Sequence, residues 1–590
     1  MLLRTGIALL LSTALLSPAA HADSPTAPRV PEQTGWGGAV SSVDPDASQV
    51  GIDVLRRGGN AVDAAVATAA ALGVTDPFSA GVGGGGYFVY YDARTGRVST
   101  LDGRETAPHA ADENLFVENG RPVPFAEAMT SGLAVGVPGT PRTWQQALRK
   151  WGTIGLREAM SPAETLARRG FVVDQTFNTQ IANNATRFAD ITSTRDLFLP
   201  GGKPPAVGSV FRNPELADTY RELARTGLAS LHGGPIGRDV VRTVQHPPVA
   251  PGAIRNVRPG QMSLLDLARY RVEEPEPTHV SYRGLDVYSM GPSSGGGTTV
   301  GEALNVLEST DLAKVSDVEH LHRFIESTKL SFADRNRWVG DPKFSQVPTK
   351  ELLSQRFADS RACLIKPGAV LPAPLAAGDP RDPKPCGAAI QASPSRQDAE
   401  NTTHLVVTDR WGNAVSYTLT IEAEGGSGIV VPGRGFLLNN ELTDFNFVPV
   451  TPGVPDPNLP GPGKRSRSSM APTIVLDRGE LAFVAGSPGG ATIITTVTQI
   501  LTLHIDRKLS LLDAIKAPRA SQRNAAVTPA EAAFIASAQA AGLSGIGHQF
   551  SQVADIGAAT AIERLPGGGW RALAEPTRRG GGAARVVRTG

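Results

Sequence analysis

The sequence predicts an α+β fold in which β-sheets are sandwiched between helices. Three predicted hairpins supply the sheets, each a pair of apolar or β-branched runs around a short polar turn. Stretches with helical patterns flank these hairpins, above all residues 140–350 and Ala491–Leu503. The 590 residues, 41% of them hydrophobic, suffice for more than one domain or for one large composite domain.

The first predicted elements are two consecutive helices. Asp44 before Pro45 is typical of a helix start, because Pro is tolerated at the first helical position. This helix is expected to end near Arg57, ahead of a Gly-Gly pair. Asn60 is the expected cap of a second, Ala-rich helix that continues through Leu72.

The hairpins and loops follow from alternation and turn residues. The hairpins are expected at Tyr87–Tyr91 with Arg97–Asp102, at Thr403–Thr408 with Asn413–Ile421, and at Thr473–Leu476 with Leu481–Ala485. Loops at Pro200–Pro205 and Gly291–Gly297 should interrupt the helical region. Residues 364–400, rich in Pro, Ala, Asp and Ser, are predicted to be a flexible loop that ends at Asn401.

Charge and the N-terminal segment bear on location and partners. The 57 basic and 56 acidic side chains give a formal charge of +1, so nothing calls for nucleic acid or an anionic membrane surface. Arg4, the apolar run Ile7–Leu16 and the small-x-small site Ala20-His21-Ala22 predict a signal peptide over residues 1–22. No later run is long and apolar enough to span a membrane. We therefore expect an exported protein, periplasmic or secreted.

The chain has two cysteines, Cys363 and Cys386. In an oxidising compartment they could form a disulfide that staples a surface loop, and two free thiols are the alternative. The ten histidines are scattered and form no Cys/His cluster in the sequence, so no metal site is expected.

A paired threonine at Thr402-Thr403 opens the second hairpin. A threonine hydroxyl is a weak nucleophile unless a base lies beside it, and its own α-amine, with a pKa near ~7.7–8.0, can be that base. This amine exists only if the bond between Asn401 and Thr402 is cut. The hypothesis is a precursor that cleaves itself; the alternative is an ordinary Thr-rich strand start.

Three later segments could bind a reacting ligand. Gly489 and Gly490 lie between a predicted strand and a predicted helix, where backbone N–H groups can form an oxyanion hole; an ordinary Gly-rich turn is the alternative. Glu441 and Asp444 could face one ammonium group, or belong to a solvated turn. Residues 465–470 offer hydroxyl and guanidinium donors for a carboxylate, or form a basic loop.

Two further residues have competing interpretations. Arg104 follows a predicted strand and could bind a carboxylate through two hydrogen bonds, although a surface salt bridge with Glu105 is the commoner outcome. His404 could serve as a catalytic base, but a neutral, packed or hydrogen-bonded ring is favoured.

In this order the segments closely resemble the γ-glutamyltranspeptidases, exported members of the N-terminal nucleophile hydrolase superfamily. The resemblance begins at Asp53–Asp63, is densest from Thr402 to Gly490 and ends at Arg579–Ala583. It implies a four-layer αββα sandwich built from two subunits. Self-cleavage would give a large subunit of residues 23–401 and a small subunit of residues 402–590, which stay associated.

The resemblance also implies a role for each site residue. Thr402 would be the nucleophile and new N-terminus, supported by the hydroxyl of Thr418. The groups implied to bind the rest of the substrate are Arg104, Ser468 and Ser469 for its α-carboxylate, Glu441 and Asp444 for its α-ammonium, and Gly489 and Gly490 for the oxyanion.

The implied activity is cleavage of the γ-glutamyl amide of compounds such as glutathione. The acyl group would pass through a Thr402 ester to water, an amino acid or a dipeptide, with no metal or organic cofactor. Two departures from the family pattern stand out. Thr420 occupies a position where many members carry an Asn that contacts the substrate ammonium, and residues 446–464 form a Pro-rich stretch with no Tyr.

Two other functions remain open at this point. A related amidase, such as a glutaryl-cephalosporin acylase, would share Thr402, self-cleavage and the Gly pair. Arg104, Ser468, Ser469, Glu441 and Asp444 favour the amino-acid head group of a γ-glutamyl donor. A catalytically silent exported binding protein is the second alternative, and it would remain one unprocessed chain.

Overall fold

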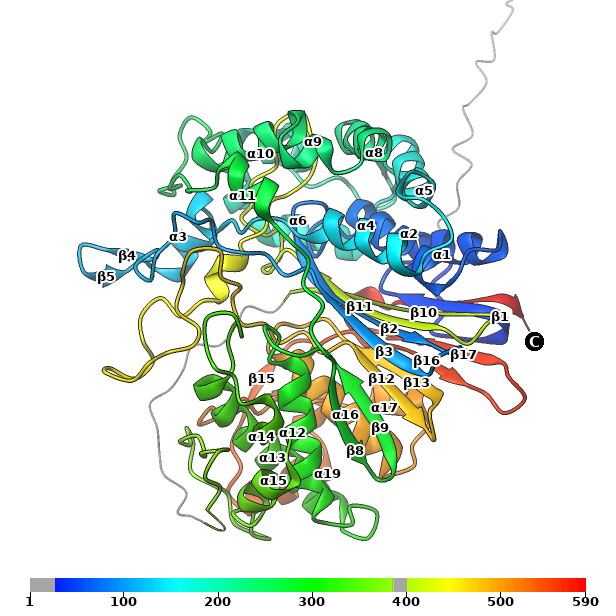
Figure 1. The fold of residues 1–590 in the computed structure, drawn as a ribbon, viewed down its shortest axis with the longest axis vertical. Helices are drawn as coiled ribbons and strands as arrows, with labels where there is room; N and C mark the ends of the chain where they lie inside the picture. The colour runs from blue at the N-terminus through cyan, green and yellow to red at the C-terminus, as the bar shows by residue number, and fades with distance from the viewer. Residues whose placement is uncertain (1–26, 385, 387–400, 590) are drawn as a thin grey trace, which may run out of the picture.

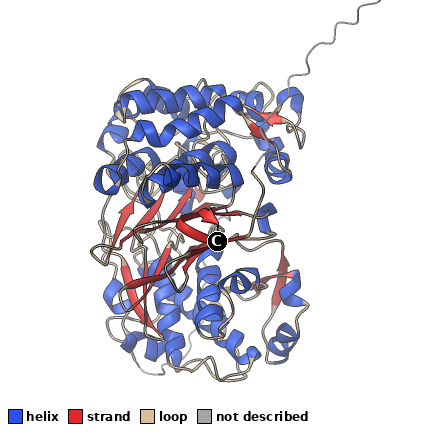
Figure 2. Cartoon of the chain, turned by 90° about the vertical axis from the view of Figure 1, so that its right-hand side faces the viewer, coloured by secondary structure: helices blue, strands red, loops and turns tan. Residues whose placement is uncertain are grey.

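A computed structural model describes residues 27–384, 386 and 401–589 of the chain. The predicted signal peptide and residues 387–400 of the predicted loop lie outside the described residues. Two groups of helices enclose a strongly curled sheet, which runs through the middle of the molecule in both views (Figures 1 and 2). The four-layer αββα prediction is confirmed.

The central sheet has 12 strands in the order β3-β2-β11-β10-β1-β17-β16-β13-β12-β9-β8, and β18 also pairs with β1. The sheet folds over so that β10 and β11 of one half pack on β13 and β16 of the other half. Its strands are β1 Glu32–Ser42, β2 Gly85–Asp92, β3 Arg97–Asp102, β8 Thr278–Tyr282, β9 Leu285–Ser289, β10 Thr403–Asp409, β11 Ala414–Thr420, β12 Thr473–Asp477, β13 Glu480–Gly486, β16 Thr560–Arg564, β17 Trp570–Ala574 and β18 Ala583–Thr589.

Strand β1 joins the two halves of this sheet. One part pairs with β17, from Glu32 to Gly35, and the other pairs with both β10 and β18 up to Ser42. The register shifts between Trp36 and Ala39, where Gly37 and Gly38 adopt positive φ values of 86° and 120°. Such a bulge bends the strand and increases its twist. Strands β1, β16, β17 and β18 were not predicted from the sequence.

Helices cover the outer faces of both half-sheets (Figure 1). The layer over β10 and β11 contains α1 Pro45–Arg56, α2 Ala61–Thr75, α4 Thr140–Trp151, α5 Leu156–Arg169, α6 Gln175–Ala189, α7 Thr192–Phe198, α8 Pro214–Thr226, α9 Ala229–His232, α10 Pro235–Gln245 and α11 Leu264–Arg269. The layer beyond β12 and β13 contains α12 Gly296–Glu308, α13 Asp317–Trp338, α14 Thr349–Leu352, α15 Gln355–Ala362, α16 Thr492–Ile505, α17 Leu511–Lys516 and α19 Ala538–Gly545.

Alternating side chains of β10 build two separate cores. Leu405 and Val407 pack into the core beneath α1 and α2, whereas Val406 points between the two half-sheets. This is the period-2 alternation of a strand that is buried on both faces. Every residue of β10 is accordingly buried, which holds the start of the strand, just after Thr402, in a fixed position.

The local predictions at the start of the chain are confirmed. Asp44 caps α1 by accepting a hydrogen bond from the backbone N–H of Ala47. Asn60 caps α2 in a capping box with Asp63, and α2 continues to Thr75 rather than ending at Leu72. All three predicted hairpins form, as does the helix expected at residues 491–503. The loop expected at Pro200–Pro205 begins with a short 3₁₀ turn, η2 Pro200–Gly202.

Two expectations for residues 140–350 were wrong. The β8–β9 hairpin lies inside the region predicted to be helical, because its strands pair with β12, which is far away in the sequence. The predicted loop Gly291–Gly297 ends early, since Gly296 and Gly297 already belong to α12. A Cβ at Gly296 would lie 2.1 Å from the Met470 carbonyl oxygen, so this helix start needs a glycine for close packing.

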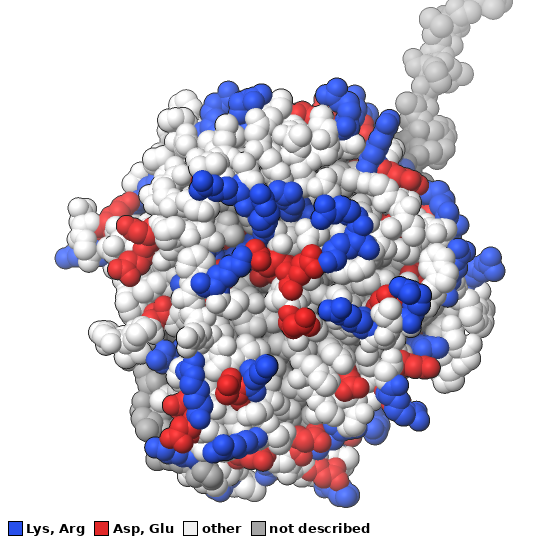
Figure 3. All heavy atoms as spheres, viewed as in Figure 1, with Lys and Arg blue, Asp and Glu red and all other residues white. Residues whose placement is uncertain are grey.

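The surface charges are mixed (Figure 3), and the helices lack a membrane-spanning segment among the described residues. Lys and Arg side chains lie among Asp and Glu side chains over the face shown in Figure 3. Among the described residues, every helix is too short or too polar to cross a membrane.

The capping box of α2 yields a stability prediction. Replacing Asn60 with Ala removes the side-chain acceptor for the N–H groups of Val62 and Asp63. We expect the free energy of unfolding to fall by about 1 kcal/mol, read from the urea midpoint. The exposed Asn256→Ala variant is the control and should leave the midpoint unchanged. Equal midpoints for both variants would contradict the proposed importance of this cap.

Candidate active site

Most of the predicted site residues line one small pocket at the start of β10. Its lining consists of Arg104, Asn401, Thr402, Thr420, Glu422, Glu441, Asp444, Ser468, Ser469, Met470, Gly490 and Ile493. Its volume is about 20 Å³, which is room for about one water molecule. Segments from both sides of the predicted cleavage point therefore converge here. Thr418 and Gly489 lie outside this lining.

The Thr402 hydroxyl lies against the peptide bond that it is predicted to cut. The hydroxyl donates a short hydrogen bond to the carbonyl oxygen of Asn401. Its Oγ1 also lies 3.3 Å from Oγ1 of Thr420, which in turn accepts a hydrogen bond of 2.9 Å from the Glu422 backbone N–H. The pairing register of β10 and β11, one step beyond Thr403 and Leu419, places these two hydroxyls opposite each other.

The register gives Thr418 a different partner from the one expected. Thr418 pairs with His404, and its hydroxyl lies 2.8 Å from Nδ1 of that ring. The hydroxyl next to Thr402 is therefore that of Thr420. Thr420 also lines the pocket. A two-residue shift along β11 keeps the same face, so the alternation pattern could not distinguish these two threonines.

His404 is fully buried, and burial lowers its pKa to about 3. The ring also packs against Gly486, where a Cβ would lie 2.3 Å from it. A neutral, packed histidine was the favoured interpretation of the sequence, and the structure agrees with it.

Arg104 is buried among carboxylates rather than exposed on the surface. Its guanidinium group makes short ion pairs with Glu441 and Asp444 and donates a 3.1 Å hydrogen bond to Oγ of Ser466. Burial alone would lower the pKa of Arg104, but Asp444 and its other anionic neighbours raise it overall, so the group stays charged. The surface salt bridge with Glu105 does not form. Glu105 is itself buried, and burial raises its pKa to about 8.

A single 3₁₀ turn, η3 Glu441–Asp444, places the two carboxylates side by side. Both side chains are buried and both face Arg104. A buried charge is stable only when it is paired, so this cluster needs opposite charges close together. A ligand that carries both a carboxylate and an ammonium group meets that requirement.

Ser468 and Ser469 also line the pocket. Oγ of Ser468 accepts a hydrogen bond of 3.1 Å from the Met470 N–H. Oγ of Ser469 accepts one from the guanidinium of Arg335 in α13, which also donates to the Ser468 carbonyl oxygen at 3.3 Å. Sequence reasoning missed Arg335, because only the tertiary fold brings α13 to this loop.

Gly489 and Gly490 immediately precede α16, and both have positive φ values, 133° and 54°. A Cβ at Gly489 would lie 2.4 Å from Oγ1 of Thr492, so only glycine fits there. Gly490 lines the pocket at the N-terminal end of this helix. Backbone N–H groups at a helix N-terminus favour negative charge.

Glu422 is a second pocket residue that sequence reasoning missed. It has a positive φ of 78°, which is uncommon for a residue with a side chain, and its carboxylate accepts a short hydrogen bond from Asn440. Continued alternation from Thr418 and Thr420 would have placed it on the same side as those threonines. The pocket thus contains a third carboxylate in addition to Glu441 and Asp444.

Two further chemical groups lie outside this pocket. Cys363 and Cys386 form a disulfide. Within the described part of the chain, His322, Glu326 and His548 place ligand atoms within 4.8 Å of one another. The two rings share a hydrogen bond of 2.8 Å, and Glu326 pairs with Lys329 at 2.8 Å. Because these atoms already have partners in the chain, we assign the group a structural role.

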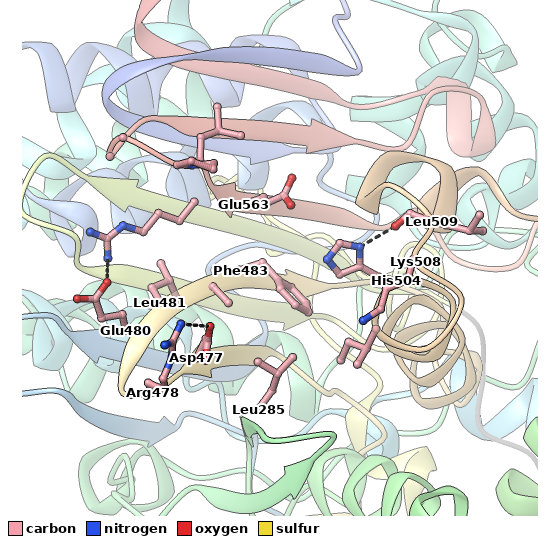
Figure 4. Close-up of a pocket in the computed structure, with 17 residues that line it drawn as sticks. Leu285, Asp477, Arg478, Glu480, Leu481, Phe483, His504, Lys508, Leu509 and Glu563 are labelled. Atoms are coloured by element: carbon pink, nitrogen blue, oxygen red, sulfur yellow. Dashed lines mark hydrogen bonds and ion pairs between the residues drawn. The ribbon is translucent and has the colours of Figure 1, made fainter. Parts of the chain in front are cut away.

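A larger pocket of about 930 Å³ lies between the β12–β13 turn and the end of α16 (Figure 4). Phe483 and His504 face it, and two of its rim carboxylates form ion pairs, Asp477 with Arg478 and Glu480 with Arg564. Its lining contains no predicted site residue. Size therefore does not identify the reacting centre here.

The buried state of His404 can be tested by titration. We expect its ring signals in ¹⁵N-histidine NMR spectra to stay unchanged from pH 8 to pH 5, whereas free histidine in the same tube titrates near pH 6.5. Below about pH 6.5 the unfolded chain gains a proton at this ring and the folded protein does not. The free energy of unfolding should therefore fall as the pH drops further. A His404 midpoint near pH 6 would contradict this assignment.

Comparison with known proteins places this geometry in a family. The sequence model described as Gamma-glutamyltranspeptidase matches residues 47–585. The glutathione hydrolase proenzyme of Bacillus subtilis (strain 168) is 38% identical over 490 residues, which cover 82% of this chain and 80% of that protein. The Acylase ACY 1 proenzyme of Pseudomonas sp. (strain SE83) is 32% identical and covers 94% and 95% of the two chains. The crystal structure of a cephalosporin acylase from Bacillus halodurans matches with a TM-score of 0.82 at 27% identity, covering 98% of this chain and 100% of that one. The chain therefore belongs to the γ-glutamyltranspeptidase family.

Proposed function

We propose that this chain is a self-processing γ-glutamyl hydrolase and transferase with Thr402 as its nucleophile. Its donors would be glutathione and related γ-glutamyl compounds, and its acceptors water, amino acids or dipeptides. One observation carries the proposal. A hydroxyl that touches its own preceding carbonyl lies in the same pocket as a buried set of groups suited to an amino-acid head group.

Self-cleavage needs only groups that are already in contact. The Thr402 hydroxyl oxygen attacks the Asn401 carbonyl carbon and forms an ester, and the bond from that carbon to the Thr402 nitrogen breaks. The hydroxyl proton passes to the departing nitrogen. Water then hydrolyses the ester, leaving a carboxylate on Asn401 and restoring the hydroxyl. The new α-amine beside this hydroxyl can act as a base in later turnovers.

Cleavage would separate residues 23–401 from residues 402–590, and the sheet explains why the two parts would stay together. Strand β1 of the first part pairs with β10, β17 and β18 of the second part. Strand β2 pairs with β11, and β9 pairs with β12. Separation would break the main-chain hydrogen bonds of five strand pairs in one sheet, together with the cores on both faces.

Each pocket group then has a proposed role in turnover. Arg104, Ser468 and Ser469 bind the α-carboxylate of the donor, while Glu441 and Asp444 bind its α-ammonium. In the empty pocket Arg104 pairs with the two acidic side chains, so a zwitterionic head group can insert between existing opposite charges. The Thr420 hydroxyl and the Glu422 N–H orient the Thr402 oxygen.

The chemistry at the γ-amide follows from these positions. The Thr402 hydroxyl attacks the γ-carbonyl, and the N–H groups of Gly489 and Gly490 would stabilise the oxyanion, a contribution that is typically worth ~3–4 kcal/mol per donor. The leaving amine takes a proton, and a γ-glutamyl ester remains. Water or an acceptor amine then attacks the ester and releases the γ-glutamyl group.

The uncut chain would be inactive for steric reasons. Asn401 lines the pocket, whose volume of about 20 Å³ cannot accept a γ-glutamyl group. Cutting the chain at Asn401 frees that wall. The disulfide between Cys363 and Cys386 supports maturation in an oxidising compartment, in keeping with the proposed periplasmic or secreted location.

A related acylase is the second candidate, because the cephalosporin acylase structure covers nearly the whole chain. A glutaryl donor carries a carboxylate but lacks the α-ammonium group. It would leave Glu441 and Asp444 without the cation that they are placed to bind. Relative rates on γ-glutamyl and glutaryl anilides distinguish the two activities.

The decisive test combines intact mass with activity. The purified protein should show two fragments divided before Thr402 and should release aniline from a γ-glutamyl anilide, faster with added glycylglycine. Thr402→Ala should remain one chain and show no turnover, because one hydroxyl serves both acyl transfers. Two fragments with normal turnover in that variant would contradict the proposal. Two fragments that act only on the glutaryl anilide would favour the acylase.

The two threonines of β11 provide a matched pair of variants. Thr420→Val removes the hydroxyl next to Thr402 and should lower kcat/KM at least about tenfold, the equivalent of one hydrogen bond. Thr418→Val removes the partner of His404 and should lower the melting temperature with a smaller effect on kcat/KM. The opposite order of effects on kcat/KM would restore the role that the sequence suggested for Thr418.

A further inference from the structure

We propose that the segment Asp76–Ser79 is a holder for the cleavage site, which recognises the side chain of Asn401 and thereby sets the rate of self-cleavage. This inference rests on the proposed function, since it assumes that the bond before Thr402 is the one that breaks. It concerns the residue on the other side of that bond.

The carboxamide of Asn401 is matched at both of its polar atoms. Its Nδ2 donates a hydrogen bond of 2.7 Å to the Phe78 carbonyl oxygen, and its Oδ1 accepts one of 3.1 Å from the Ser79 hydroxyl. All three residues are buried, with Asn401 only 4% exposed. A side chain needs a donor and an acceptor in this arrangement to satisfy both partners, and an asparagine carboxamide provides them.

The holder is a fixed part of the fold. It follows directly after α2, and the Asp76 N–H bonds to the Leu72 carbonyl oxygen at 2.8 Å. The Ser79 carbonyl oxygen accepts a hydrogen bond of 3.1 Å from the Ile421 N–H, which lies just beyond β11. The Phe78 ring packs with Phe177 and Phe198, at centroid distances of 5.1 and 4.9 Å. Asn401 is therefore held by a segment anchored to both α2 and β11.

Thr402, on the C-terminal side of the scissile bond, is also held by a hydrogen bond. Nη1 of Arg579 donates a hydrogen bond of 2.8 Å to the Thr402 carbonyl oxygen. With both flanking residues fixed, the Asn401 carbonyl stays in contact with the Thr402 hydroxyl. Holding reacting groups in one geometry lowers the barrier of the step that joins them. Loss of the Asn401 anchor should therefore slow cleavage without touching the nucleophile.

The protonation state of Asp76 sets whether the Ser79 hydroxyl is free to donate its hydrogen bond to Asn401. The Ser79 hydroxyl has one hydrogen and two possible acceptors, Oδ1 of Asp76 at 2.9 Å and Oδ1 of Asn401 at 3.1 Å. An ionised Asp76 attracts that hydrogen to itself. A protonated Asp76 can donate its own hydrogen to the Ser79 oxygen, which leaves the Ser79 hydrogen for Asn401.

The surroundings of Asp76 place this change near neutral pH. Burial is the main cause that raises its pKa, and nearby Asp44 adds to the rise. Arg579 and the hydroxyls of Ser79 and Thr403 lower it, and the balance of these effects is a pKa of about 7. The acid form therefore predominates below about pH 7, where the hydrogen-bond chain to Asn401 is complete. As the pH rises through 7 the carboxylate form takes over, and the hold on Asn401 weakens.

The test is a pulse–chase measurement of self-cleavage in the full chain, synthesised in a cell-free system and sampled on denaturing gels. Ser79→Ala and Asn401→Ala should each slow cleavage about tenfold, the effect of one lost hydrogen bond. Asn401→Asp should be slower still, because it sets a carboxylate oxygen against the Phe78 carbonyl oxygen. Ser131→Ala removes a buried hydroxyl that bonds to the Ala128 carbonyl oxygen, and this control should cleave at the wild-type rate.

Once cleaved, the Ser79→Ala protein should turn over a γ-glutamyl anilide with the wild-type kcat/KM, because the holder acts before the chain is cut. A general folding defect would lower the melting temperature and both rates together. Wild-type cleavage rates in both Ser79→Ala and Asn401→Ala would overturn the holder. Failure of the proposed function looks different, since the wild-type chain would then not divide before Thr402 or would lack γ-glutamyl turnover.

Cleavage rates measured at different pH values test the role of Asp76 separately. Wild-type cleavage should slow as the pH rises from 6 to 8, whereas Asp76→Asn, whose side chain can donate to Ser79 at every pH, should lose most of that dependence. Identical pH profiles for the two proteins would remove Asp76 from the holder.

Discussion

The register between β10 and β11 is the constraint on which the rest of the site depends. It sets Thr402 opposite Thr420 and His404 opposite Thr418, and β2 continues the same sheet on the other edge of β11. Because side chains alternate with a period of two, a slip by one residue would turn every one of these groups to the other face. Both faces of β10 are buried, so such a slip would also disrupt two cores.

A second constraint is electrostatic. Arg104, Glu441 and Asp444 are all withdrawn from water, and their desolvation is offset by their mutual pairing and by the hydrogen bonds of Arg104 to Ser466. Such a cluster contributes little net stability, but it presents separated positive and negative charges at fixed positions. The low dielectric constant of the buried site makes the desolvation of these three charges unfavourable. It would also strengthen their attraction to a ligand of complementary charges. The fold thus holds these three charges in a buried cluster that a solvent-exposed loop could not form.

The sequence predicted correctly those elements whose capping and turn residues lie within the element itself or directly beside it. The caps at Asp44 and Asn60 and the three hairpins are encoded within a few residues of where they form. Strand β1 was not predicted because its pairing partners lie hundreds of residues away in the sequence. Its glycines, which form the bulge, also interrupt the residue pattern that is typical of a strand. Family motifs named most of the residues that line the pocket. The contact of Thr420 with Thr402, and the positions of Glu422 and Arg335, depend on register and on contacts between distant segments.

The position of β1 also governs when the site can exist. This strand is among the first parts of the chain to be synthesised, yet its partners β17 and β18 are among the last. At ~5–20 residues per second, tens of seconds pass between the two. Until β17 and β18 arrive, β1 is a strand without its partners on one edge, and Arg579 is not in place beside Thr402. The proposed self-cleavage would therefore have to wait until β17, Arg579 and β18 have been made and the sheet can close.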